Sequence, residues 1–338
     1  MKFRVVIVLF FIIHLIPYSV FSDPAEQTPI SLEVTYPENQ VKGTTGYFDL
    51  MVDPGDEQVL ELEVTNNLEN EITIMMESAN AYTHPSGGIT YGQDIQSPNM
   101  TLLDDGIRLS DFMTVPQEVQ LDPLSTETVS FEISVPELDG GTLLGAIRVI
   151  IPSQEDDDFE ELGEDEAQFI IDTETVYTIA TQLNLPEEVD SNLTIGETDF
   201  TTDTGNVYVE LINDAHKLQD GVHGEYFVSN ENGEELFDGE FGRLLMAPKS
   251  QVRHVFPWDY EAIEEGTYTV DIQATADNQE ELSVTRNFTI GGEDIEEYVE
   301  RTDHPVNVQL NQGMPVWGWI LIILLAGGVF YFLGRRRG

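Results

Sequence analysis

The stretch from Tyr47 to Asn67, YFDLMVDPGDEQVLELEVTNN, gathers the carboxylates of Asp49, Asp53, Asp56 and Glu57 around a Pro-Gly pair. Carboxylates this close together could bind a cation or perform acid–base chemistry. However, Pro and Gly are also the residues that a β-turn prefers, and apolar residues alternate with glutamates after the pair. We therefore predict strand, turn and strand, with Asp53 and Asp56 flanking the turn and Glu57 mostly facing solvent, and keep a cation site as the alternative.

Other chemistry-bearing patterns are few. The histidines show no His-Glu-x-x-His spacing, and the chain contains no nucleophile elbow and no P-loop. The acidic run Ser153–Gln168 could collect Ca²⁺, but it lacks the spacing of a calcium loop and is typical of a solvated loop. We predict no catalytic residues, no metal and no cofactor.

Two loops carry aromatic residues among polar ones. Tyr82 and Tyr91 lie in the Gly-rich segment Asn80–Gln93, where aromatic faces could stack on the sugars of a glycan. The alternative is that they close the edge of a β-sandwich. Trp258 precedes a Gly-Thr-Tyr strand, which favours a core position.

The charge is strongly acidic. Asp and Glu number 63 against 14 Lys and Arg, and the net charge is −49. Such a surface repels nucleic acid, so nucleic acid is excluded as a partner. The chain has no cysteine, which excludes a disulfide framework.

Both ends of the chain are apolar. Residues 1–22 combine Lys2 and Arg4 with an apolar run and are predicted to be a secretory signal peptide. Residues 316–334 are long enough for a transmembrane helix. Trp317 and Trp319 would anchor it at the outer interface, and a basic stub, residues 335–338, would stay inside because it contains Arg335, Arg336 and Arg337. We therefore predict a single-pass protein of the cell membrane with its N-terminal domains outside.

Between the ends, short alternating or apolar runs recur about every ten residues and are separated by Gly, Pro, Asn and Asp. This pattern is typical of antiparallel sandwiches. We predict an all-β fold with two tandem immunoglobulin-like domains, 23–186 and 187–292, followed by an acidic stalk, 293–315. The two domains repeat one feature, a strand ending in asparagine, at Asn66 and at Asn213. The boundary between them could instead fall in the acidic run.

The chain also resembles the WxL-interacting proteins of Gram-positive bacteria. The resemblance rests on motifs in three segments, Gly46–Asn67, Glu77–Gly92 and Gly141–Val149. The matching positions are Phe48, Asp49, Leu50, Pro54, Gly55, Asn66, Ala81, Thr83, Gly88 and Tyr91. These motif residues are typical of positions that shape the scaffold, so they identify the family better than they indicate a mechanism.

The resemblance implies an extracellular adaptor that is not an enzyme. Its first domain would bind peptidoglycan, its second would bind a host extracellular-matrix protein, and WxL-domain surface proteins would be its partners. Two alternatives stay open: an adhesin that acts through its second domain, and a wall hydrolase with a carboxylate pair in a cleft.

Overall fold

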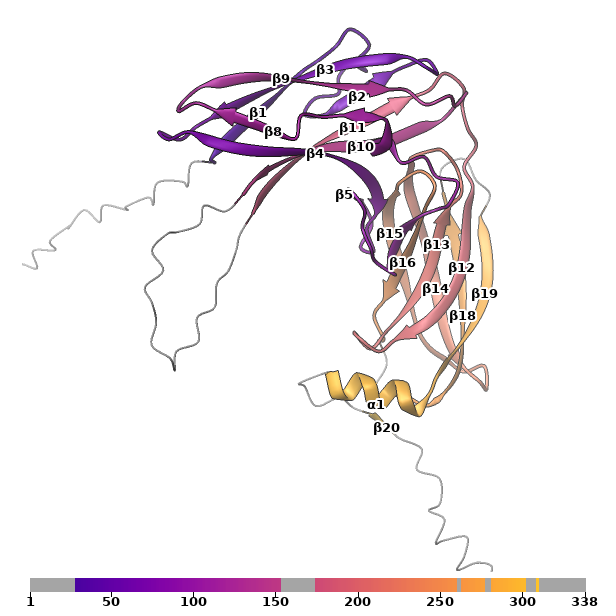
Figure 1. The fold of residues 1–338 in the computed structure, drawn as a ribbon. Helices are drawn as coiled ribbons and strands as arrows, with labels where there is room; N and C mark the ends of the chain where they lie inside the picture. The colour runs from indigo at the N-terminus through magenta and orange to yellow at the C-terminus, as the bar shows by residue number, and fades with distance from the viewer. Residues whose placement is uncertain (1–27, 153–173, 260–262, 277–280, 302–307, 310–338) are drawn as a thin grey trace, which may run out of the picture.

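The computed structural model describes residues 28–152, 174–259, 263–276, 281–301 and 308–309 (Figure 1). The predicted signal peptide, the acidic run and the predicted transmembrane helix lie outside these residues. The described part is built of β-sheets with one short α-helix, which confirms the all-β prediction. The strand pairs are antiparallel except that Phe48–Met51 runs parallel to Thr175–Asn184 and Ile263–Glu264 runs parallel to Val308–Gln309.

The N-terminal unit, with core residues from Ile30 to Leu185, consists of two sheets packed face to face. Sheet A has the order β1 (Ile30–Thr35), β3 (Glu57–Asn66), β9 (Thr126–Ser134) and β7 (Met113–Thr114). Sheet B has the order β2 (Phe48–Met51), β11 (Thr175–Asn184), β10 (Thr142–Ile151), β4 (Ile72–Thr83) and β5 (Ile89–Gly92), and β8 (Glu118–Leu121) also pairs with β4. The 3₁₀ helix η1 (Leu109–Phe112) places Leu109 in the core between them.

Alternation explains why these residues form a sandwich. In β9, Val129, Phe131 and Ile133 point inward while their neighbours are exposed. The ring of Phe131 meets Phe48 of the opposite sheet edge-to-face at 5.6 Å between centroids. The strands β10 and β11 are both rich in apolar residues and pair antiparallel at ten positions.

The C-terminal unit, with core residues from Leu193 to Ile295, also has two packed sheets. Sheet C has the order β12 (Leu193–Thr201), β13 (Asn206–Asn213), β16 (Ser250–Phe256) and β6 (Met100–Leu102). Sheet D has the order β15 (Glu235–Met246), β14 (Gln219–Asn230), β18 (Gly266–Thr275) and β19 (Leu282–Ile290). The two-residue strands β17 (Ile263–Glu264) and β20 (Val308–Gln309) pair with each other.

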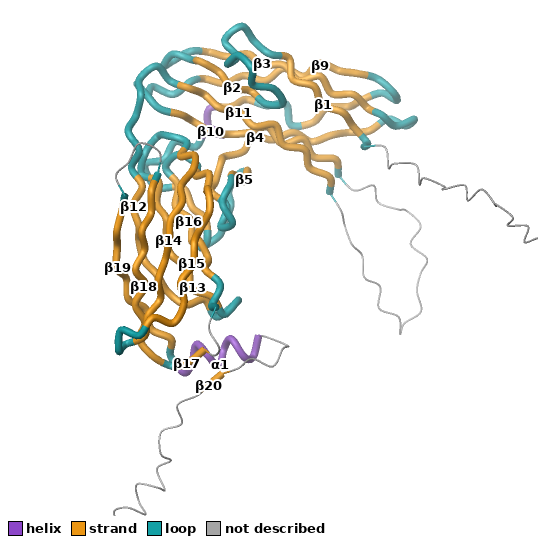
Figure 2. The backbone as a smooth tube through the Cα atoms, turned by 180° about the vertical axis from the view of Figure 1, so that it is seen from behind, coloured by secondary structure: helices purple, strands orange, loops and turns teal. Residues whose placement is uncertain are grey.

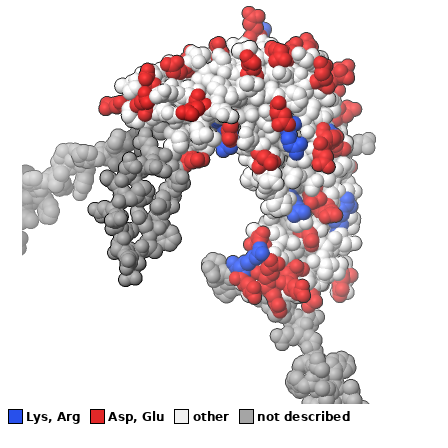
Figure 3. Space-filling view, viewed as in Figure 1, with Lys and Arg blue, Asp and Glu red and all other residues white. Residues whose placement is uncertain are grey.

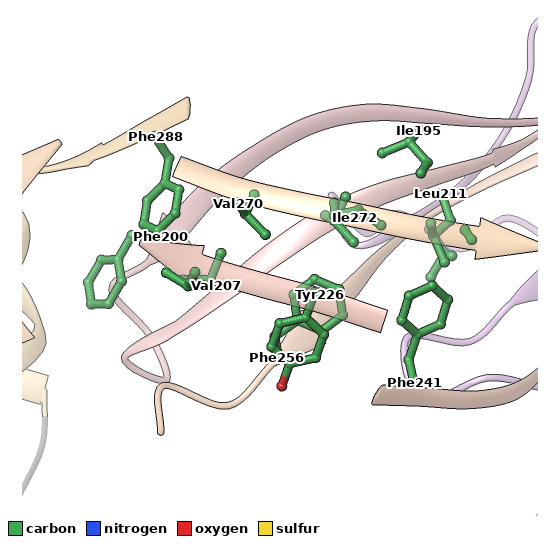
Figure 4. Packing of buried hydrophobic residues seen from close by; sticks show 14 of the residues in the cluster. Ile195, Phe200, Val207, Leu211, Tyr226, Phe241, Phe256, Val270, Ile272 and Phe288 are labelled. Atoms are coloured by element: carbon green, nitrogen blue, oxygen red, sulfur yellow. The ribbon is translucent and has the colours of Figure 1, made fainter. Parts of the chain in front are cut away.

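Aromatic residues fill this second core (Figure 4). Tyr226 stacks on Phe256 with 4.0 Å between the ring centroids. Trp258 packs against the core and meets Phe237 and Tyr268 edge-on, each at 5.2 Å, which confirms its predicted core position.

The two units meet at a steep angle, so that the molecule is bent (Figures 1 and 2). The units are joined by more than a linker, because β6 comes from the first third of the chain and pairs with β16 in sheet C. The end of β4 also reaches the second unit. There the Thr83 and Ser250 hydroxyls lie 2.6 Å apart, both buried, and the Ala247 backbone N–H donates to Thr83 Oγ1 at 2.9 Å.

A helix follows the last strand. The sequence predicts an acidic stalk from residue 293, whereas the structure has the helix α1 over Gly292–Arg301. Its Ile295 is fully buried, and its Tyr298 meets Phe200 edge-to-face. Arg301 pairs with Asp203 and Glu297. The helix therefore covers one end of the second sandwich.

The predicted single-pass membrane location is contradicted. Over the described residues, no helix has both the length and the apolar composition needed to cross a bilayer. The α1 helix has ten residues and would span only about 15 Å, half of a hydrocarbon core of about 30 Å. The residues offered as the membrane anchor, Trp317, Trp319, Arg335, Arg336 and Arg337, lie outside the described residues.

Candidate functional site

The carboxylates of the opening motif serve the scaffold. Asp49 is buried, with its carboxylate accepting from Thr44 Oγ1 at 3.0 Å and from Asn184 Nδ2 at 2.7 Å. The Asp53 N–H donates to Asp56 Oδ2 at 3.0 Å, and Gly55 between them has φ +79°. This is the predicted Pro54–Gly55 turn, except that it connects sheet B to sheet A instead of closing a hairpin.

Two buried asparagines form equivalent corners in the two units. Asn66 Nδ2 donates to the carbonyls of Asn70 at 2.8 Å and Asp122 at 3.0 Å. Asn213 Nδ2 donates to the carbonyls of Lys217 and Ala247, each at 2.8 Å. Both side chains are fully buried at the end of a strand. The strand ending in asparagine, which the sequence shows once in each unit, is therefore a buried corner where the asparagine side chain hydrogen-bonds the loop that follows.

The later motif residues lie at the junction of the units. Ala81 packs with Leu144 and Ala247 in a small cluster between the two sandwiches. Thr83 makes the buried contacts to Ser250 and Ala247 described above, and the Gly88 N–H donates to the Leu245 carbonyl at 3.2 Å. These family-motif positions therefore hold the two units together.

The two tyrosines proposed for glycan contact have different surroundings. Tyr82 is only 3% exposed, and its hydroxyl accepts from the Ile95 N–H at 3.3 Å. Tyr91 is half-buried and packs against the junction cluster around Ala247. Burial, with a smaller contribution from the Tyr47 phenol, raises the pKa of Tyr91 to about 12. Neither ring stands out as an open stacking platform.

A hollow of about 500 Å³ opens beside Tyr82. Its lining combines apolar and polar side chains: Tyr82, Asp94, Ile95, Gln96, Ser97, Pro98, Thr101, Leu102 and Arg108. Arg108 is exposed and, over the described residues, forms no ion pair with any carboxylate. The hollow thus offers hydrogen-bonding groups for hydroxyls and one guanidinium for an anion.

Comparison with protein families decides the identity. Residues 31–150 match the peptidoglycan-binding domain of the WxL Interacting Protein family, and residues 166–300 match its host-binding domain. The chain belongs to the WxL-interacting protein family. Its domains are therefore those of a cell-surface binding protein, which agrees with the predicted family and domain order.

The second matched region of this WxL-interacting protein begins before the second sandwich does. It includes β11, which lies between β2 and β10 in sheet B and contributes Leu183 to the first core. In the other direction, β6 from the peptidoglycan-binding match completes sheet C. Each matched region therefore supplies a strand to the other unit.

Other comparisons add little. Among curated proteins nothing matches. Similar solved structures include the Salmonella enterica SafA pilin in complex with the SafB chaperone, at 11% identity over 77% of this chain and 96% of that chain with a TM-score of 0.31. The E. coli chaperone DraB matches at 12% identity over 78% and 98%, with a TM-score of 0.30. At these TM-scores the likeness carries no inference.

Arg108 lines the hollow beside Tyr82 but is not among the site residues that the sequence predicts. The signal for it was its rarity, because only nine Lys and Arg lie between the two apolar ends of this acidic chain. Acidic side chains cover much of the visible surface and basic ones are few (Figure 3). The described residues contain no group of three or more His, Asp or Glu arranged to hold a metal ion.

Titratable groups gather at the junction. Lys249 Nζ pairs with Asp105 at 2.6 Å and Asp214 at 2.8 Å, one carboxylate from each unit. Burial, and then the Lys249 ammonium, lowers the pKa of His216. Burial also lowers the pKa of His254, whose Nδ1 lies 2.9 Å from the Pro85 carbonyl across the junction.

We expect the junction histidines to make the protein less stable in mild acid. A depressed folded-state pKa means that stability is complete above the ordinary value of 6.5 and is lost as the pH falls through the folded value. Between pH 7 and pH 5 the wild type should lose a few degrees of Tm more than the variant carrying His216→Gln and His254→Gln. Thermal unfolding of both proteins across this range checks it, and parallel curves would contradict it.

Proposed function

We propose that the chain is a non-catalytic cell-surface adaptor that binds peptidoglycan and WxL-type wall proteins. In this proposal, two immunoglobulin-like domains, residues 23–186 and 187–292, perform the binding. The gap between the end of β11 at Asn184 and the start of β12 at Leu193 supports this boundary. The observation that carries the proposal is the hollow beside Tyr82 in the matched peptidoglycan-binding region.

The hollow's chemistry fits a wall fragment. Peptidoglycan combines sugar hydroxyls with the carboxylates of its peptides. Asp94, Gln96 and Ser97 can hydrogen-bond hydroxyls, while Arg108 can pair with a carboxylate. Tyr82 lines the hollow, and Tyr91 lies on the paired strand β5 and packs in the junction cluster.

We expect Arg108→Glu to reduce peptidoglycan binding by about tenfold, because a charge-assisted hydrogen bond is worth roughly 1.5–3 kcal/mol. The measurement is the fraction of purified residues 23–315 that sediments with insoluble peptidoglycan. Lys42→Glu is the matched control, since it makes the same charge change at an exposed position outside the hollow. Equal losses from both variants would mean that overall charge, not the hollow, controls binding.

The second candidate function is that of an adhesin that binds a host or extracellular-matrix protein through 187–292. The match of residues 166–300 to the family's host-binding domain favours it. The two functions differ in their dependence on the hollow. Arg108→Glu reduces wall binding about tenfold in the first and leaves matrix-protein binding unchanged in the second.

A further inference from the structure

The outer face of sheet D carries a second hollow, of about 510 Å³. It is lined by His223, Gly224, Glu225, Glu240, Phe241, Gly242, Arg243, Gln273, Thr275 and Glu281. The register between β14 and β15 shifts between Val222 and Gly224, which bends the strands beside it. Gly242 adds to the space, since a Cβ there would meet no atom within 4 Å.

Charged side chains line this hollow in two neighbouring rows. In the first, Glu225 lies directly opposite Glu240 on β15 and Gln273 on β18. In the second row, His223 of β14 lies opposite Thr275 of β18, and Arg243 of β15 also lines the hollow. The first row is acidic. The second row contains Arg243, the one guanidinium of the lining, and the lining also includes Glu281.

The acidic row is not neutralised within the molecule. Like charges directly opposite on neighbouring strands destabilise a sheet. Over the described residues, no Lys or Arg pairs with Glu225 or Glu240, and no carboxylate pairs with Arg243. A ligand that carries both charges would satisfy both rows.

The spacing of the rows indicates what kind of ligand fits. His223 and Glu225 are two residues apart on β14 and both are exposed, so the rows are about 6.6 Å apart. In an extended peptide, side chains at positions i and i+2 point to the same side with the same spacing. We propose that this hollow binds an extended protein segment in which a basic and an acidic residue alternate at i and i+2.

In this arrangement the basic side chain lies between Glu225 and Glu240, and the acidic side chain meets Arg243. The inference deepens the proposed function, because it rests on the C-terminal unit being a partner-binding module. It also names the partner's chemistry: a protein with alternating charges in an exposed strand. An anionic glycan is disfavoured, because the two glutamates would repel it.

Two immobilised peptides of equal composition test the charge spacing. One repeats Arg-Thr-Glu-Thr three times, which places every Arg and Glu on one face when extended. The other repeats Arg-Glu-Thr-Thr, which places them on opposite faces. We expect purified residues 23–315 to bind the first at least tenfold more tightly. Equal binding would reduce the interaction to general charge attraction and overturn the inference.

A plug variant tests the location. A Cβ at Gly242 would meet no atom within 4 Å, so Gly242→Trp should place its side chain in the hollow and abolish binding of the first peptide. Thr289→Trp is the matched control, because Thr289 is exposed near the far end of β19, outside the hollow. Retained binding by Gly242→Trp would also overturn the inference.

Sedimentation of the same proteins with peptidoglycan tests the proposed function separately, since wall binding depends on Arg108 in the other unit.

Discussion

Replacing Gly141 with alanine is expected to lower the free energy of unfolding by about 2–4 kcal/mol. Gly141 has φ +98°, and a Cβ there would overlap the backbone carbonyl of His216 in the other unit. That carbonyl accepts from the Thr142 N–H at 2.8 Å, while the Gly141 N–H donates to the Glu187 carbonyl at 2.9 Å. The variant must therefore both strain its backbone and push the two units apart. Chemical denaturation of purified residues 23–315 measures the loss.

Gly43 is the matched control for this effect. Its φ of +95° is nearly the same, but a Cβ there would meet no atom within 4 Å. Gly43→Ala should therefore cost only the backbone strain, about 1–2 kcal/mol. If Gly141→Ala and Gly43→Ala cost the same, the close approach between the units contributes nothing to stability.

Replacing Asn66 with alanine should cost a similar amount, about 2–4 kcal/mol. The change leaves the buried carbonyl of Leu121 and the part-buried carbonyl of Asp122 without the Nδ2 donor, and the Leu68 N–H without its acceptor at 2.9 Å. Buried groups left unsatisfied lose their full desolvation energy. Asn213→Ala should behave in the same way at the equivalent corner of the second unit.

The neighbouring Asn67 is the control for the effect of burial. Asn66 Nδ2 makes three hydrogen bonds, whereas Asn67 Nδ2 makes two, to the Thr28 carbonyl and to Ser31 Oγ, each at 2.9 Å, and both of these are exposed. Water can replace these partners, so Asn67→Ala should cost less than about 1 kcal/mol. Equal losses at Asn66 and Asn67, measured by the same denaturation, would contradict the corner's role.

Both predictions concern a molecule whose halves are interlocked. Cutting the chain near residue 186 would separate β6 from β16, Thr83 from Ser250, and Lys249 from Asp105. Binding by one half is therefore best tested with point variants in the intact chain. The same interlocking fixes the bend between the two units, so a ligand on one unit is presented at a defined angle to a ligand on the other (Figure 2).

Local pattern made much of the fold predictable. Alternation in β9 and the apolar runs of β10 and β11 are properties of single segments, and those strands are where the sequence places them. The Asn-Gly pair at Asn232 and Gly233 is a local turn signal of the same kind, and it lies between β14 and β15 with φ +76° at Gly233. Family motifs added the order of the two domains.

What could not be predicted depends on contacts between distant segments. The three residues of β6 are too few to show a period, and their partner β16 is about 150 positions away. The α1 helix is strongly acidic, and only its packing of Ile295 on the second unit reveals why it forms. For the same reason Tyr82 could not be assigned to a hollow from its neighbours in the sequence, and Arg108 had no motif at all.

The most direct measurement is sedimentation of purified residues 23–315 with insoluble peptidoglycan over a range of salt concentrations. We expect the wild-type protein to enter the pellet together with the wall, and Arg108→Glu to stay largely in the supernatant while Lys42→Glu still pellets. If the wild-type protein stays in the supernatant at every salt concentration, this chain does not bind peptidoglycan and the proposed wall adaptor is contradicted.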